Sequence, residues 1–181
     1  MNMEDVAGTW VIDPAHSDVG FTVRHMMISK VRGGFGAVSG TIITDGNPSE
    51  TKIDVSIDVT SISTKDENRD NHLRSGDFFD VENYPQMTFK STAVRTTKDE
   101  DTYELDGDLT IKDVTRQVTL KVEFGGINTD PYGNRKGAAS ASTSIKRSEY
   151  GLTWNVALET GGVMVSDEVK IEIELQAALQ K

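Results

Sequence analysis

The sequence predicts an all-β protein, with eight antiparallel strands closed into an up-and-down barrel and one short helix. Three observations support this prediction. Apolar and polar residues alternate with period two over eight segments, turn signals separate most of them, and one segment breaks the alternation. The same strands could also fold as a two-layer sandwich. The barrel is favoured because eight is even, so that the last strand can pair antiparallel with the first and remove both sheet edges.

The predicted strands follow this alternation in chain order. The clearest example is the segment from Ile53 to Thr60, where every second residue is apolar and the residues between are polar. Turn residues at 45–48, 99–101 and 130–134 mark boundaries between strands. The predicted strands cover residues 19–25, 36–44, 52–60, 86–95, 102–111, 117–124, 138–146 and 168–177.

The segment without the alternation contains the predicted helix, at about residues 65–74. Thr64 and Glu67 have the spacing of a capping box, in which each side chain bonds the other residue's backbone N–H. Gly76 is suited to the left-handed position that follows a helix. Residues 26–30 show a weaker helical or irregular pattern. The whole chain, 1–181, is expected to form one domain, with residues 1–7 disordered.

Composition excludes several classes of function. The chain has 181 residues, a formal net charge of −10 and no cysteine. The charge disfavours binding to nucleic acid and polybasic docking to anionic membranes. The absence of cysteine excludes disulfides and thiolate sites, and the three histidines lack the spacing of a metal motif, so no metal site is expected. No apolar run is long enough for a signal peptide or an integral membrane segment, which predicts a cytoplasmic location.

Four sequence blocks resemble the YceI-like family. They begin with Trp10 to His25 and continue with Arg69 to Phe89, Leu109 to Thr115 and Arg147 to Leu152. They occur in order over nearly the whole chain. The resemblance implies an extended lipocalin-like barrel whose interior binds an amphiphilic isoprenoid lipid, either a polyisoprenoid or an isoprenoid quinone. It implies no obligatory cofactor, and a homodimer is conceivable at the level of the family.

The alternation and the resemblance together define a predicted binding site. Its apolar lining comprises Phe21, Val23, Ile42, Val55, Ile57, Phe78, Phe89, Leu105 and Leu109. A polar end comprises His25, Arg69, His72 and Arg147, because all odd-numbered strands of an up-and-down barrel point the same way. These polar residues could form a collar for a ligand headgroup. Alternatively, the helix plugs the barrel and the two arginines pair with Asp66, Asp70 or Glu149.

The sequence therefore favours non-enzymatic binding, storage or transport of an isoprenoid lipid. No catalytic motif is present: there is no G-x-S-x-G turn, and Gly33–Gly36 precedes a strand instead of the helix that a phosphate loop requires. Two alternatives remain open. One is an enzyme acting on such a lipid at the polar end, and the other is a filled barrel with a role in stress protection or in interaction.

Overall fold

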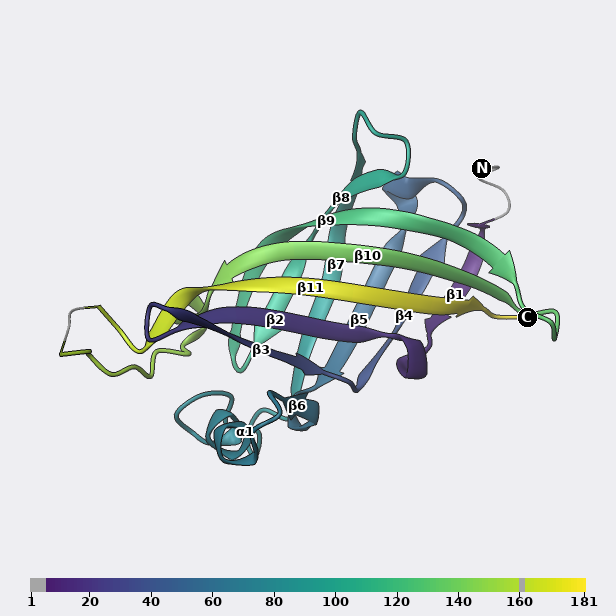
Figure 1. The fold of residues 1–181 in the computed structure, drawn as a ribbon. Coiled ribbons are helices and arrows are strands. Elements are labelled where there is room, and N and C mark those ends of the chain that lie inside the picture. The colour runs from purple at the N-terminus through teal and green to yellow at the C-terminus, as the bar shows by residue number, and fades with distance from the viewer. Residues whose placement is uncertain (1–5, 160–161) are drawn as a thin grey trace.

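The computed structural model describes residues 6–159 and 162–181, and its strands form a closed antiparallel barrel (Figure 1). The first three strands of the barrel are each divided into two segments. β1 (Gly8–Ile12) and β2 (Asp18–His25) both pair antiparallel with β11 (Val165–Leu179), on either side of the 3₁₀ turn η2 (Pro14–His16). They are therefore two halves of one bent strand.

The second strand of the barrel consists of β3 (Ser29–Phe35) and β4 (Val38–Thr44), which pair with β2 and β1 respectively. The third consists of β5 (Lys52–Asp58), which pairs with β4, and β6 (Ile62–Ser63), which pairs with β3. Two 3₁₀ turns, η3 (Pro48–Glu50) and η4 (Val59–Ser61), lie before and after β5.

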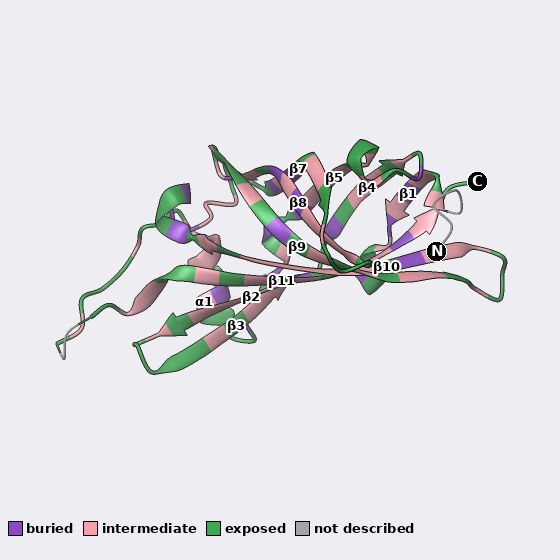
Figure 2. Ribbon diagram, turned by 90° about the horizontal axis from the view of Figure 1, so that it is seen from above, coloured by how far each residue is buried: buried purple, intermediate pink, exposed green. Residues whose placement is uncertain are grey.

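The remaining strands of the barrel are β7 (Gln86–Thr96), β8 (Thr102–Ile111), β9 (Val114–Thr129), β10 (Arg135–Lys146) and β11. The ring runs β1-β4-β5-β7-β8-β9-β10-β11 and closes where Trp10 of β1 pairs with Leu179 of β11. This confirms the predicted eight-stranded antiparallel barrel. Figure 2 shows buried and exposed residues succeeding one another along the strands, as the period-two pattern requires.

The structure corrects the prediction for residues 26–35. The segment predicted to be helical or irregular contains the turn at 26–28, and β3 begins at Ser29. Gly33 and Gly34 have no side chains and therefore interrupt the alternation of apolar and polar residues that would have indicated this strand. A glycine is needed at Gly33, since a Cβ atom there would lie 2.5 Å from the ring of Phe21. The disorder predicted for residues 1–7 falls mainly on residues 1–5, which lie outside the described residues.

The α-helix in the described part of the chain, α1 (Glu67–Arg74), has different caps from those predicted. Its N-cap is Asp66, whose carboxylate accepts a hydrogen bond from the N–H of Arg69 at 3.0 Å. The hydroxyl of Thr64 instead donates to Asp70. The helix ends at Ser75, whose N–H bonds the carbonyl of His72, and Gly76 is not in the left-handed region.

Helix α1 lies beside β6, at the side of the barrel formed by β2 and β3 (Figure 1). The apolar residues Leu73, Phe78 and Phe79, in the helix and the segment after it, pack on the core cluster that contains Phe35 and Ile62. The helix segment thus forms part of the barrel's interior wall. None of the helices in the described part of the chain has the length and apolar character needed to cross a bilayer.

Candidate functional site

The barrel encloses an apolar cavity of about 240 Å³. Side chains that point inward from nine of the labelled strands, β2 to β5 and β7 to β11, and from the α1 segment line it, as the alternation predicts. Of the residues that line it, only Ser140, Thr143 and Arg147 have polar side chains. Eight of the nine residues predicted as apolar lining do face this cavity: Phe21, Val23, Val55, Ile57, Phe78, Phe89, Leu105 and Leu109.

The ninth predicted lining residue, Ile42, lies in another part of the interior. It does not line the central cavity but a second pocket of about 580 Å³ toward the opposite end of the barrel, together with Trp10 and Tyr103. The inward direction of its side chain follows from the alternation, but its position along the barrel axis does not. The second pocket shares Ile53, Leu105, Val122 and Ala139 with the central cavity, so the two spaces adjoin.

Small residues create the space inside the barrel. Ala139 and Ala141 on β10 line the cavity opposite large aliphatic side chains. On β8, the ring of Phe89 lies directly over Gly107, where a Cβ atom would clash with it. Larger residues at the two alanines would fill the interior, since protein cores otherwise pack to the density of organic crystals. The cavity therefore depends on particular positions in the sequence.

Arg147 lies at the end of the cavity and is buried, with a relative exposure of 6%. It begins the 3₁₀ turn η5 (Arg147–Tyr150), and its guanidinium donates to four backbone carbonyls. The acceptors and donor–acceptor distances are Leu152 at 2.6 Å, Ser166 and Trp154 at 2.9 Å, and Val165 at 3.0 Å. Burial lowers the pKa of Arg147, and the negative charge of Asp167 opposes this shift.

These bonds overturn the pairing predicted for Arg147. None of its four acceptors is a carboxylate, and Glu149 is not among its partners. Four of the five guanidinium N–H groups are occupied by the protein's own backbone. Arg147 therefore joins the segment after η5 to the start of β11, and this leaves it little capacity to hold a headgroup.

Arg69 is not among the residues that line the cavity. Its Nε donates to the Thr64 hydroxyl at 2.8 Å, and its Nη2 donates to the Thr64 carbonyl at 3.0 Å. The Thr64 hydroxyl in turn donates to the buried carboxylate of Asp70 at 2.6 Å. The expected direct pairing of Arg69 with Asp66 or Asp70 is therefore replaced by a chain of bonds through Thr64. This network ties the helix to the residue that follows β6.

The two predicted histidines occupy different positions. His72 contacts Asp77 at 2.8 Å, and its ring meets the edges of Phe78 and Trp154, with centroid distances of 5.1 and 4.7 Å. His25 ends β2 and pairs in register with Val165. Trp154 and Val165 also accept hydrogen bonds from Arg147, so His25, His72 and Arg147 do gather around one segment. Arg69 does not join them.

The sequence did not identify several lining residues that the structure reveals. Leu73 and Phe79 enter from the helix segment, which has no period-two pattern. Ile145, Ile171 and Ile173 come from β10 and β11, where the alternation was visible and could have identified them. Within the described ranges, 6–159 and 162–181, no group of three histidine or acidic residues is placed to hold a metal ion.

Comparison with known proteins gives consistent matches over most of the chain. The family model described as the YceI-like domain matches residues 10–177. A UPF0312 protein of Staphylococcus aureus is 38% identical over 174 residues, covering 95% of this chain and 98% of that protein.

Solved structures show the same fold. The crystal structure of BcnA from Burkholderia cenocepacia superposes with a TM-score of 0.77 at 26% identity, covering 91% of this chain and 98% of that one. A YCEI protein of Campylobacter jejuni has a TM-score of 0.73 at 32% identity and covers 87% of this chain and 90% of its own. A domain from Saccharophagus degradans described as polyisoprenoid-binding has a TM-score of 0.73 at 15% identity, covering 94% and 98%. At that identity the likeness concerns the fold.

Proposed function

We propose that this chain, which belongs to the YceI-like family, binds an amphiphilic isoprenoid lipid inside its barrel and does not transform it chemically. The observation that carries this proposal is the central cavity, whose wall is almost entirely aliphatic and aromatic. Each CH₂ group that such a wall removes from water contributes about 0.8 kcal/mol. An apolar tail is therefore the ligand that gains most from this site.

The shape of the interior supports a long ligand over a compact one. The second pocket adjoins the central cavity and continues toward the opposite end, past Trp10 and Ile42. A chain of isoprene units could extend along this path. The fold relative described as polyisoprenoid-binding supports the same class of ligand, a polyisoprenoid or an isoprenoid quinone. A protein that holds such a lipid away from water would serve in its storage or transport.

The polar groups around the cavity support binding without catalysis. General acid or base chemistry needs a titratable group within about 3 Å of the reacting atom. His72 instead contacts Asp77 and packs against Phe78, and four N–H groups of Arg147 are bonded to carbonyls. The residues expected to bind a headgroup thus have mainly structural partners, and the apolar wall supplies most of the affinity.

A cavity-filling substitution tests this proposal. Ala141→Trp places an indole inside the cavity, whereas Ser142→Trp places one on the outer face of the same strand. We expect Ala141→Trp to weaken binding of a short-chain isoprenoid quinone at least tenfold, measured by isothermal titration calorimetry. Overpacking should cost about 1–3 kcal/mol of stability, so thermal unfolding is recorded in parallel. If Ala141→Trp is folded and binds the quinone like the unmodified protein and Ser142→Trp, the cavity is not the site.

A further inference from the structure

Two loops extend together beyond one end of the barrel. One is the β2–β3 turn at residues 26–28, and the other comprises residues 155–159 and 162–164, which precede β11 (Figure 1, left). The N–H of Met26 donates to the Met164 carbonyl at 2.7 Å, and the N–H of Met164 donates to the Val156 carbonyl at 2.9 Å. These bonds make the two loops one structural unit.

This unit carries a cluster of exposed apolar side chains, which we call the apolar knob. Relative exposures are 44% for Met26, 50% for Met27, 84% for Ile28, 46% for Val156 and 38% for Val163. Within the described part of the chain, these are five of the seven large hydrophobic residues that are exposed. Exposed apolar residues that are scattered singly need no explanation, but a cluster of this kind marks an interaction site.

The backbone at the tip gives a second indication. Met26 and Met27 are the two central residues of the four-residue turn from His25 to Ile28, with φ of 53° and 64°, and the N–H of Ile28 bonds the His25 carbonyl. Turns with positive φ at both positions favour Asn-Gly, because glycine has no Cβ and asparagine tolerates this region. Two methionines at these positions lower the stability of the folded hairpin. The stability of the hairpin therefore does not explain these side chains.

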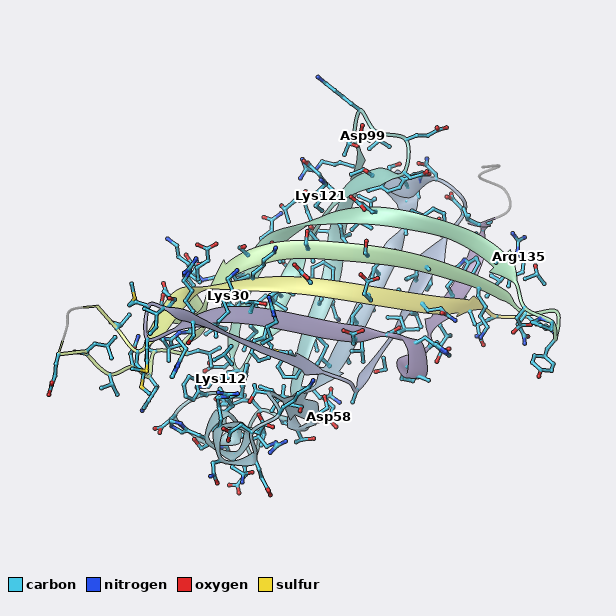
Figure 3. The ribbon with its side chains drawn as sticks, in the orientation of Figure 1. Lys30, Asp58, Asp99, Lys112, Lys121 and Arg135 are labelled. Carbon is cyan, nitrogen blue, oxygen red and sulfur yellow. The ribbon has the colours of Figure 1, made fainter. Side chains whose placement is uncertain are left out.

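Cations flank the knob. The chain as a whole has a net charge of −10, yet residues 19–44 contain no acidic residue and include Arg24, Lys30 and Arg32. Arg24 lies directly opposite Lys30 in the ladder, where like charges repel. Among the described residues, none of these three cations forms an ion pair with a carboxylate. Figure 3 labels Lys30 on this hairpin.

We propose that the apolar knob inserts into the surface of an anionic phospholipid bilayer, with Arg24, Lys30 and Arg32 against headgroup phosphates. Protruding apolar side chains flanked by cations are typical of proteins that lie on a membrane. Glu159 on the second loop, and Asp167 and Glu168 on the part of β11 opposite Arg24, offset this positive charge, so the protruding apolar side chains are expected to supply most of the affinity. Acidic residues elsewhere on the chain act weakly at the knob, because the Debye length is about 8 Å at physiological ionic strength.

The position of the apolar knob beside the central cavity also supports docking to a membrane. Val23 and Val165, at the bases of the two loops, both line the central cavity. Docking would therefore bring the cavity's end to the membrane from which a lipid is taken or to which it is delivered. Docking itself goes beyond the proposed lipid binding and does not require it.

Flotation with vesicles tests the docking proposal. The vesicles contain phosphatidylglycerol and phosphatidylcholine, and we expect the unmodified protein to float with them. The double variant Met26→Asn/Met27→Gly should fold with equal or higher thermal stability, while its partition to vesicles falls at least about tenfold. The matched control is Tyr132→Asp, which removes a side chain that is 85% exposed in the β9–β10 turn at the opposite end. It should float like the unmodified protein.

A second variant tests the contribution of the three cations to membrane binding. Exchanging Arg24, Lys30 and Arg32 for glutamine should reduce partition to the anionic vesicles by about fivefold per charge. Ala141→Trp should float normally, which separates docking from the lipid binding proposed for the cavity. The proposal is overturned if the unmodified protein does not float, if Tyr132→Asp loses as much partition as the knob variant, or if Ala141→Trp fails to float. A knob variant that still floats but changes from dimer to monomer in sedimentation would instead assign the surface to a second copy of the chain.

Discussion

Arg147 shows how a buried cation can be accommodated without a carboxylate partner. Its guanidinium is surrounded by carbonyl oxygens of Leu152 and Trp154 on one segment and of Val165 and Ser166 on another. Carbonyl dipoles that point at a cation stabilise it, and hydrogen bonds to charged groups contribute more than neutral ones. The side chain therefore fixes the end of the cavity wall where β11 begins.

Replacing Arg147 should consequently affect stability strongly. Arg147→Ala leaves four carbonyls without their donor, and we expect the free energy of unfolding in urea to fall by about 3–5 kcal/mol. Arg95→Ala is the control, because Arg95 lies on the surface and pairs there with Glu104 and Asp106. It should change the unfolding midpoint far less. Equal losses for the two variants would show that the four bonds contribute little.

The carboxyl group of Asp167 makes the stability of the folded protein depend on pH. Burial raises the pKa of its carboxyl, but the hydroxyl and N–H of Ser148, at 2.8 and 2.9 Å, and the charge of Arg147 together lower it below 3.8. The unfolded chain therefore binds this proton more tightly than the folded one. The contribution of Asp167 to stability is present above the unfolded pKa and is lost as the pH falls through the folded pKa.

The substitution Asp167→Asn should therefore make the free energy of unfolding depend less on pH in the acidic range. We expect the variant to be less stable than the unmodified protein at neutral pH, with a smaller further loss between about pH 5 and pH 2. Urea unfolding midpoints across this range provide the measurement. Parallel curves for the two proteins would indicate that the pKa of Asp167 is the same in the folded and unfolded states.

At the scale of elements, the sequence predicted those strands whose alternation is unbroken. Residues 52–60 and 102–111 were placed within a few positions, and their inward residues line the cavity. β3 was missed because Gly33 and Gly34 interrupt the pattern. The partners of the two arginines could not be predicted, because both bond backbone carbonyls, which no side-chain pattern reveals, and for Arg147 two of these carbonyls lie 18 and 19 residues away in the chain. For Ile42 the pattern gave the inward face but not its depth in the barrel.

Helix α1 depends on the network of Arg69, Thr64 and Asp70. Thr64→Val keeps the shape of the side chain but removes the hydroxyl that donates to Asp70 and accepts from Arg69. We expect the free energy of unfolding to fall by about 1–3 kcal/mol, because the buried carboxylate of Asp70 loses one of its two donors and keeps only the N–H of Thr64. Hydrogen exchange of the helix amides should accelerate at the same time. Thr60→Val is the control, since its hydroxyl bonds Asp58 in an exposed position, and an equally large effect there would contradict this role for the network.

For the molecule as a whole, the closed barrel serves two purposes. Closure of β1 on β11 satisfies the backbone groups that the two strands would otherwise expose at the edges of the sheet. The small residues at 139 and 141 then leave an interior space that a filled barrel would lack. The fold thus encloses an apolar space, and under the proposed function the chemistry of its wall determines the class of ligand.

The most direct test of this account is native mass spectrometry of the freshly purified protein. We predict a population that carries one added mass per chain, matching an isoprenoid lipid, and we predict that Ala141→Trp lacks it. The unloaded population should take up an added isoprenoid quinone in the same proportion of one per chain. A protein that carries no added mass and takes up no quinone would contradict the central claim that the barrel interior is a lipid-binding site.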